Sequence, residues 1–421
     1  MSGRVATPEA AAACTSRADA QALDAACPLA HSRARFRLPE GVLYLDGNSL
    51  GALPVATPAH MARVVEEEWG RSLIGSWNSA GWISAPQRIG AAIAPLVGAQ
   101  PDEVIVADSV SVNLFKLLAA CLALRPGRRV ILSEPGNFPT DLYIAQGLAA
   151  LVPGVEVRTV AAPHLADALG PEVAVLMLTH VHYKWASVHD MAGLTAAAHA
   201  AGALAVWDLS HSAGALVVEL NAAGADFAVG CGYKYLNGGP GAPGFLFAAR
   251  RHHAHIAQPL SGWMGHARPF DFTDAYAPAP GMDRFLCGTP PILALGALEA
   301  GVATFDGIAM PDVAAKAHAL SALLQARMAA CAPALVLASP ADPAERGSHL
   351  VFRHPDAYAI CQAAIARGLV GDFRAPDLWR LGLMPLYTRY ADVWDAAEVA
   401  GDILASGAWR APGFARRSTV T

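Results

Sequence analysis

Charged residues are scarce in this 421-residue sequence: Lys, Arg, Asp and Glu make up only 15% of it, whereas 54% of the residues are hydrophobic. A chain of this length and composition can bury a large core and is too long for one small domain. The formal net charge of −5 leaves no basic excess of the kind that binds nucleic acid. These features are typical of a globular enzyme without a nucleic-acid partner.

Long uninterrupted apolar runs are also missing. The most apolar stretch, residues 201–220, is broken by Asp208, Ser210, His211 and Glu219, and a membrane-spanning helix needs roughly 20 apolar residues in succession. The first residues contain no compact apolar run followed by a cleavage site, so we expect no signal peptide. The sequence therefore predicts a cytoplasmic protein that does not associate with a membrane.

Paired cysteines are a third absence. The seven cysteines are odd in number and scattered, and none forms a CxxC pair. This pattern argues against a disulfide framework and against a zinc site, so we expect free thiols and no metal.

Short apolar runs alternate with stretches of helical length through the middle of the chain. This alternation is typical of a mainly parallel sheet with helices on both faces. In such sheets ligands bind outside the carboxyl ends of the strands. We predict strands at Val104–Ala107, Arg129–Leu132, Val173–Leu178, Ala203–Trp207, Ala225–Val229 and Gly244–Ala248, and helices at Val112–Leu124, Asp141–Leu151 and Met191–Ala201.

The remainder of the chain has a different pattern. A helix from Ala52–Pro54 to Gly70 is expected before the sheet, and two long helices, Ile292–Phe305 and Asp312–Ala330, are expected after it. Short strands and helices then follow, which predicts a smaller α/β domain. We divide the chain into an N-terminal segment (1–55), a large domain (56–305) and a small C-terminal domain (306–421). The first 25 residues are Ala-rich and fit either a helix or a frayed tail.

An acid and a lysine follow two successive predicted strands. Asp208 lies where the strand Ala203–Trp207 ends, and Lys234 follows the next strand and precedes a glycine-rich turn. Pyridoxal phosphate (PLP) needs both groups: a lysine to carry it, and an acid to keep its pyridine nitrogen protonated. Taken singly, Asp208 fits a turn residue and Lys234 a solvated amine. Considered together, the two residues and their spacing favour a PLP site over these separate explanations.

Two further features fit the same site. His211 follows Asp208 by three residues and can share its face, although a lone His is more often a structural residue. Ser109 and Ser111 stand at the start of a helical run, where backbone N–H groups bind phosphate. For Ser111 a simple helix N-cap is an equally good explanation.

Several longer motifs resemble those of kynureninase, a PLP enzyme with the fold type I of aspartate aminotransferase. They occur in the family's order and span the chain from about Leu45 to Trp394. The motifs YKYLN and GWxGH distinguish this family from other enzymes of that fold. The matching segments are Leu45–Gly51, Arg71–Trp82, Asn137–Asp141, Asp208–His211, Tyr233–Asn237, Gly262–His266, Gly288–Ile292 and Met384–Tyr387.

This resemblance implies the fold, the reaction and the site. The fold would be a large domain with a mainly parallel seven-stranded sheet, plus a smaller C-terminal α/β domain. The reaction would be the hydrolysis of L-kynurenine to anthranilate and L-alanine in tryptophan degradation. Lys234 and Tyr233 would be catalytic, with Tyr233 as proton donor. The cofactor-binding positions would be Val110, Ser111, Phe138, Pro139, Thr140, Asp141, Thr179, Asp208, His211, Tyr233, Lys234, Trp263 and Thr289.

The resemblance also implies how the substrate is bound. Arg380 would hold the α-carboxylate, a task suited to a guanidinium fork, although a surface ion pair is the simpler explanation. Trp77, Asn48 and Ser49 would complete the substrate site. Trp77 and Thr289 match the bacterial enzymes, which favours L-kynurenine over 3-hydroxykynurenine, while core packing explains Trp77 equally well. Trp263 and Thr289 would reach the cofactor across a dimer interface, which implies a homodimer.

Other functions fit the sequence less well. A cysteine desulfurase shares the fold but needs a reactive Cys on a mobile loop, and Cys231 lies in a strand-to-turn segment. A PLP carrier without catalysis would have no use for Arg380. The spacing GxGxxG at Gly239–Gly244 leads into a strand rather than a helix, and no GxxxxGK[ST] occurs, so a nucleotide-binding protein is disfavoured.

Overall fold

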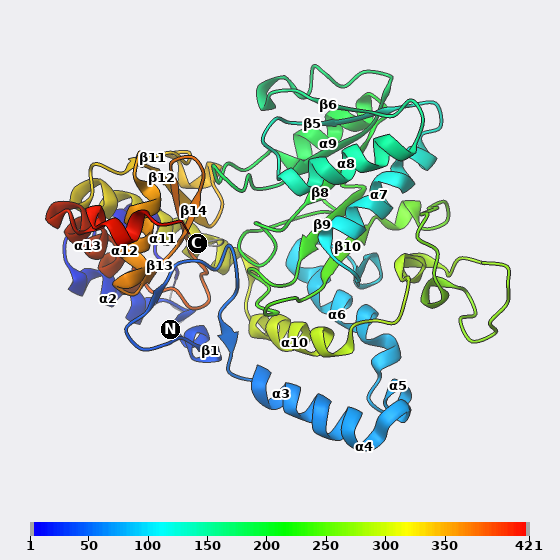
Figure 1. Ribbon diagram of the computed structural model, residues 1–421, viewed down its shortest axis with the longest axis horizontal. Helices are drawn as coiled ribbons and strands as arrows, with labels where there is room; N and C mark the ends of the chain where they lie inside the picture. The colour runs from blue at the N-terminus through cyan, green and yellow to red at the C-terminus, as the bar shows by residue number, and fades with distance from the viewer. Residues whose placement is uncertain (1–3, 418–421) are drawn as a thin grey trace.

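The computed structural model describes residues 4–417 and contains two units, which lie side by side in Figure 1. The larger unit is built on a seven-stranded sheet with the order β4-β10-β9-β8-β7-β5-β6. Strands β5 to β9 pair in parallel, and β10 runs antiparallel to both of its neighbours. The strands are β4 (Val104–Val106), β5 (Val130–Ser133), β6 (Glu156–Thr159), β7 (Val173–Thr179), β8 (Leu204–Asp208), β9 (Phe227–Cys231) and β10 (Gly244–Ala248).

Alternate residues of the strands enter two separate hydrophobic clusters, one on each face of the sheet. Ile131 packs in one cluster, whereas Val130 and Leu132 pack in the other, as the period-2 geometry of a strand requires. Helices α7 (Val110–Leu124) and α8 (Pro139–Leu151) cover the Ile131 face. Helices α6 (Ala85–Ile93), α9 (Met191–Ala200) and α10 (Ile292–Val302) cover the other face.

This architecture confirms the predicted fold class. All six strands predicted from apolar runs are present, each with ends within two residues of the predicted range. The edge strand β6 was not among them, because none of its residues is buried and Glu156, Arg158 and Thr159 interrupt its apolar pattern.

The smaller unit has a four-stranded sheet with the order β11-β12-β15-β14. Its strands are β11 (Val336–Leu337), β12 (His349–Arg353), β14 (Asp372–Arg374) and β15 (Leu378–Gly382), and its helices are α11 (Met310–Cys331), α12 (Ala357–Ala366) and α13 (Tyr390–Ser406). The boundaries proposed for the domains at residues 55 and 305 remain a prediction.

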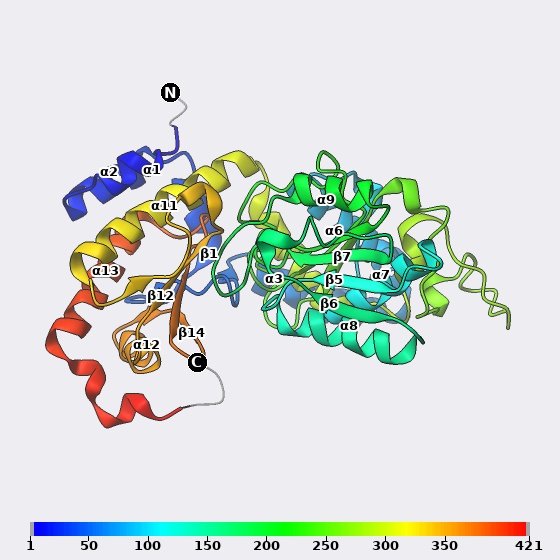
Figure 2. The ribbon, with the colours of Figure 1, turned by 90° about the horizontal axis from the view of Figure 1, so that it is seen from above.

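The start of the chain packs against this smaller unit. Helices α1 (Pro8–Ala12) and α2 (Arg17–Ala26) contact α11 and α13 and lie beside α11 in Figure 2. Ser16 caps α2 through a capping box with Asp19, which satisfies backbone groups at the helix start. Strand β2 (Leu43–Tyr44) pairs in parallel with β13 (Leu369–Val370). Of the two options for the first residues, the structure shows helices.

The helix predicted to end at Gly70 is interrupted. It consists of α3 (Thr57–Arg63), a π-helical stretch η2 (Val64–Trp69) and α4 (Gly70–Ser72). Between residues 4 and 417 no single helix is long and apolar enough to cross a membrane. One pair, Ile292–Phe305 with Met310–Cys331, meets the length and composition criteria together but bends by 82°.

Helix α6 packs so closely on the sheet that a side chain at Gly90 has no room. A Cβ there would lie 2.3 Å from Val104 O and 2.8 Å from Ile105 Cα. We predict that Gly90→Ala lowers the free energy of unfolding by about 1–3 kcal/mol, because the helix must move off the strand. Urea denaturation measures this change.

Gly147 is the matched control, because it lies in helix α8 and a Cβ added there would have nothing within 4 Å of it. Gly147→Ala should raise the free energy of unfolding by roughly 0.5–1 kcal/mol, the usual gain in an open helix position. Equal effects of the two substitutions would contradict the close packing of α6.

Candidate active site

A cavity of about 250 Å³ opens at the carboxyl ends of β8 and β9. Asp208 ends β8, Cys231 ends β9, and the first turns of α7 and α8 complete the wall. Nine of the residues predicted for the site line it. The lining residues are Ser109, Val110, Ser111, Phe138, Thr140, Asp141, Asp208, Ser210, His211, Cys231, Tyr233, Lys234, Ala242 and Gly244.

Lys234 is buried, which contradicts a solvated surface amine: its exposed fraction is 8%. Its Nζ lies 3.1 Å from Nε2 of His211. Burial, and then the charge of Lys234, keep the pKa of His211 well below its usual value. The imidazole is therefore neutral, so Nε2 accepts from the ammonium and Nδ1 carries the ring proton.

Two carboxyl groups face the lysine from the other side of the cavity. Asp208 accepts hydrogen bonds at Oδ1 from the backbone N and the hydroxyl of Ser210. Asp141 accepts one from Asn137, whose amide oxygen accepts from the Thr179 N–H. Burial raises the pKa of both acids, and the charge of Asp208 raises that of Asp141 further. Because Ser210 and Lys234 favour the ionised form of Asp208, Asp141 holds the proton and Asp208 the charge.

The start of α7 forms the polar end of the cavity. Ser109 is the N-cap and accepts from Val112 N, so the alternative that Ser111 is the N-cap is wrong. The backbone N–H groups of Val110 and Ser111 belong to the first helical turn, where no intrahelical partner exists. They are suited to an anion. The carboxylate of nearby Asp108 would oppose an anion, but the buried ammonium of Lys116 pairs with it.

The turn after β9 is held by close backbone contacts. Gly51 N donates to Tyr233 O over 2.8 Å, and a Cβ on Gly51 would lie 2.6 Å from Lys234 O. Only glycine allows this approach, which brings the Leu45–Gly51 motif beside the lysine. Burial raises the pKa of Tyr233 above its usual value, so its hydroxyl keeps its proton.

Arg380 lies in β15 of the smaller unit and is 1% exposed, so the explanation as a surface ion pair is wrong. It forms a buried pair with Asp372 and donates from Nη1 to Tyr183 O. The Tyr183 ring contacts the Phe138 ring edge-on at 5.2 Å, and Phe138 lines the cavity. Tyr183 therefore contacts both Arg380 and the Phe138 side chain of the cavity wall.

The other predicted residues have different positions. Asn48 is buried, and among the described residues neither atom of its amide has a partner, while Ser49 donates to Asp372. Thr179 is buried behind Asp141, and Pro139 begins α8. Within one chain, Trp77, Trp263 and Thr289 do not line the cavity. Trp77 packs edge-on against Trp82, Trp263 lies beside Phe270 and Phe272, and Thr289 is exposed.

Sequence reasoning missed several residues around the site. Ser210 lies inside the DLSH motif and Asn137 begins the NFPTD motif, so both could have been chosen from the motifs. Tyr183, Lys116 and Asp372 carry no such signal, since their roles arise from contacts between distant parts of the chain.

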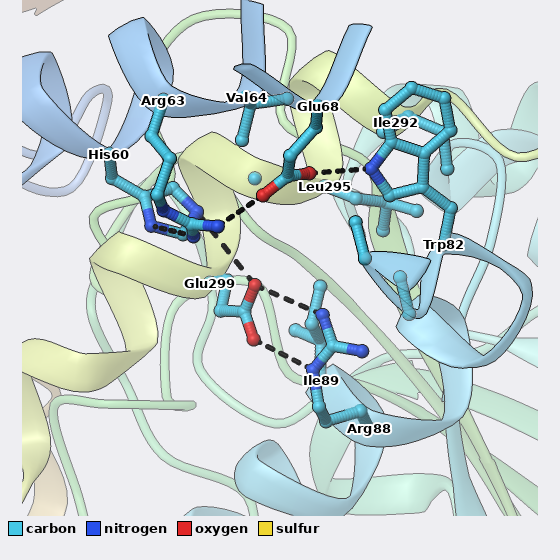
Figure 3. Close-up of a pocket in the computed structure, with 13 residues that line it drawn as sticks. His60, Arg63, Val64, Glu68, Trp82, Arg88, Ile89, Ile292, Leu295 and Glu299 are labelled. Carbon is cyan, nitrogen blue, oxygen red and sulfur yellow. Dashed lines mark hydrogen bonds and ion pairs between the residues drawn. The ribbon is translucent and has the colours of Figure 1, made fainter. Parts of the chain in front are cut away.

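A second cavity, of about 280 Å³, lies between α3, η2, α6 and α10. Figure 3 shows its charged side chains paired with one another: Glu299 with Arg88, and Glu68 with Arg63. Trp82 donates to the other oxygen of Glu68. Because these charges already have partners, this cavity is a weaker candidate for chemistry than the one at Lys234.

The cavity at Lys234 fits PLP. It offers a lysine beside an ionised acid, an aromatic ring on its wall and a helix start suited to a phosphate. Three buried polar atoms around it lack a partner in the described part of the chain: Asp141 Oδ1, Thr179 Oγ1 and His211 Nδ1. Buried groups without partners are costly, and a polar cofactor would satisfy them.

Comparison with known proteins shows the family of the chain. A family model described as kynureninase C-terminal domain matches residues 313–400. A kynureninase of Burkholderia mallei is 52% identical over 415 residues, covering 96% of this chain and 99% of the relative. A kynureninase of Pseudomonas fluorescens is 49% identical and covers 97% of this chain and 100% of its own. The chain belongs to the kynureninase family.

Solved structures with the same fold include cysteine desulfurases. One from Thermococcus onnurineus has a TM-score of 0.75 at 19% identity, covering 90% of this chain and 98% of its own. One from Escherichia coli has a TM-score of 0.72 at 20% identity, with the same coverage. This likeness shows the fold alone. Cys231, the candidate for a desulfurase, is buried at the end of β9, and burial raises the pKa of its thiol, which disfavours a thiolate nucleophile.

The LDGNSLG motif of this kynureninase-family chain contains a buried acid with an unusual pKa. Burial, and next the charge of Asp372, raise the pKa of Asp46 from 3.8 to about 7; Arg380 and Arg374 oppose this shift. The folded state therefore holds a proton that the unfolded state has lost, so stability should fall as pH rises from about 4 to about 7.

Asp46→Asn removes this effect, because Asn stays neutral. We predict that the unfolding temperature of the variant rises relative to wild type between about pH 4 and pH 8. Parallel melting profiles over this range would contradict a proton on Asp46.

Proposed function

We propose that this chain hydrolyses L-kynurenine to anthranilate and L-alanine, with PLP carried by Lys234. One observation carries the proposal: a chain half identical to kynureninases over nearly its whole length places Lys234, Asp208 and the start of α7 around one cavity. 3-Hydroxykynurenine is the alternative substrate.

Residues on each wall of the cavity would hold the cofactor. Lys234 would bind it covalently, Asp208 would pair with its pyridine nitrogen and Phe138 would stack on its ring. The phosphate would lie at the start of α7, near Tyr233. Bound there, PLP supplies an electron-withdrawing ring next to the substrate α-carbon. Pro139, Thr140, Asp141, Thr179 and His211 would complete the pocket.

The chain's own side chains would then bind the substrate and move protons. Arg380 would hold the α-carboxylate, and the amine of Lys234 would take the α-proton. Water adds to the γ-carbonyl, the Cβ–Cγ bond breaks and anthranilate leaves. Tyr233, whose hydroxyl keeps its proton, would protonate Cβ. Lys234 would return the α-proton to the α-carbon, which completes L-alanine.

The substrate's aromatic ring would lie against Trp77, near Thr289. A large apolar wall favours the unsubstituted ring over one with a hydroxyl group, because burying that hydroxyl without a partner is costly. This supports a preference for L-kynurenine.

We predict that Lys234→Ala abolishes anthranilate formation from L-kynurenine, followed by anthranilate fluorescence. The loss of the anchoring amine removes both cofactor attachment and proton transfer. Lys184→Ala is the control, since this lysine lies outside the cavity lining and should retain wild-type turnover. Anthranilate formation by Lys234→Ala at a substantial rate would refute the assignment. No turnover by the wild type would refute the function.

A homodimer is part of the proposal, and two exposed regions support it. Large apolar side chains are exposed around α3 and α4, including Ile74 at 80%, and in the loop before α10, including Phe272 at 74%. This loop extends away from the body in Figures 1 and 2. It carries Trp263 and leads to Thr289, which would let both reach a partner's cavity. Exposed apolar patches of this kind mark interfaces.

We predict that the wild type sediments at twice the mass of one chain, and that Phe272→Asp shifts it toward the monomer by placing a charge in the interface. A wild type that sediments as a monomer while retaining activity would contradict this arrangement. We also propose a cytoplasmic location, where the seven free thiols would stay reduced.

A further inference from the structure

We propose that Asp372 is the positioning residue of the substrate-carboxylate site, and that it fixes the orientation in which Arg380 presents its remaining N–H groups. The inference rests on the proposed function, because it assigns Arg380 to the α-carboxylate of an amino-acid substrate. It concerns a residue outside the family motifs noted in the sequence.

The contacts of Arg380 leave a defined part of its guanidinium free. Asp372 Oδ1 accepts from Nε over 2.7 Å, Oδ2 accepts from Nη2, and Tyr183 O accepts from Nη1. A guanidinium has five N–H donors in a fixed plane, so one donor on Nη1 and one on Nη2 remain. The second of these has only a long contact, 3.4 Å, to Ser49 Oγ. Two neighbouring donors in one plane match the two oxygens of a carboxylate.

The position of Asp372 is fixed from several sides. It pairs with Arg380 across β14 and β15, and Oδ2 also accepts from Ser49 Oγ over 2.8 Å and lies 2.7 Å from Arg374 Nη2. The side chain is 3% exposed. These contacts fix the carboxylate of Asp372 in one orientation, so it can hold the guanidinium of Arg380 in place.

The charged groups around Arg380 carry an excess of one positive charge, which favours the binding of one more anion. Burial alone would raise the pKa of Asp372, but Arg380 and Arg374 bring it below its usual value, so it is ionised. Asp46, the second acid, retains a proton up to about pH 7. Two guanidiniums therefore face one carboxylate, and a substrate carboxylate would neutralise the remaining charge. Without Asp372, the buried guanidinium of Arg380 would lose its carboxylate partner, which is costly.

A second buried polar group packs against the strand that carries Arg380. Asn48 is fully buried, and both atoms of its amide lack a partner among the described residues. It lies against Gly382, two residues after Arg380 on β15, so closely that a Cβ there would be 1.8 Å from Asn48 Oδ1. A buried amide without a partner, packed against the strand that carries Arg380, is a further group that a polar ligand would satisfy.

The test compares ligands with and without an α-carboxylate on PLP-loaded enzyme. L-Alanine carries the carboxylate, whereas kynuramine, the decarboxylated analogue of kynurenine, keeps the amine and the aromatic ring but lacks it. Binding of each is titrated through the absorption of the cofactor, and KM and kcat are measured with L-kynurenine. The variants are Asp372→Asn and Asp372→Glu. The control is Asp377→Asn, which removes a half-buried acid paired with Arg353 in the same unit.

For Asp372→Asn we expect KM for L-kynurenine and Kd for L-alanine to rise roughly 10- to 100-fold, the usual effect of a lost charge-assisted hydrogen bond. The Kd of kynuramine should stay within about twofold. Asp372→Glu keeps the charge and should recover part of the loss, which also covers the case that the Asn variant fails to fold. Asp377→Asn should behave as wild type in every assay.

Equal weakening of kynuramine and L-alanine would overturn the proposal, because it would indicate a general distortion of the site. Unchanged L-alanine binding in both Asp372 variants would overturn it as well. Failure of the proposed function has a different signature: wild-type enzyme that forms no anthranilate. The L-alanine titration still decides the role of Asp372 in that case, because it does not depend on turnover.

Discussion

The parallel pairing of β8 with β9 is the constraint on which the site depends. Asp208 lies opposite Val229 in this register, and the chain then turns so that Lys234 reaches back over the strand ends. An acid and a lysine that are 26 positions apart thus share one buried cavity. Burying either charge alone would be costly, and each lowers the cost of burying the other. Shifting β8 by one residue would turn the Asp208 side chain to the opposite face.

The remainder of the site extends from this pair in two directions. Toward α7, the backbone N–H groups of the first helical turn are suited to an anion, and Lys116 pairs with the acid that would oppose it. Toward the smaller unit, contacts run from Phe138 through Tyr183 to Arg380. The proposed cofactor wall and the proposed carboxylate site thus belong to different units, and Tyr183 contacts a residue of each. A change in the angle between the units would alter the distance between Lys234 and Arg380. The packing of the two units therefore affects how a substrate can be held.

Much of this arrangement was accessible from the sequence. Apolar runs predicted six of the seven strands because buried strands are nearly continuous in Val, Ile, Leu and Ala. Asp208 was identified because it directly follows such a run, and Lys234 because it comes after the next run and precedes a glycine-rich turn. Strand β6 was missed since none of its residues is buried, and the π-helical stretch at Val64–Trp69 was missed because its composition is that of an ordinary helix. The family motifs led to the residues around the cofactor, and to Arg380 as an isolated position.

The sequence by itself therefore determined the fold class, the two strand ends that carry the acid and the lysine, and the family. These follow from local composition and from short motifs, in which neighbours in the chain are neighbours in space. Only the tertiary structure decided which groups are paired and which are free. The partner of Arg380, the neutral state of His211 and the proton on Asp46 depend on burial and on charges from distant segments. Such electrostatic effects depend on the distance between groups in space. The spacing of residues along the chain does not give that distance.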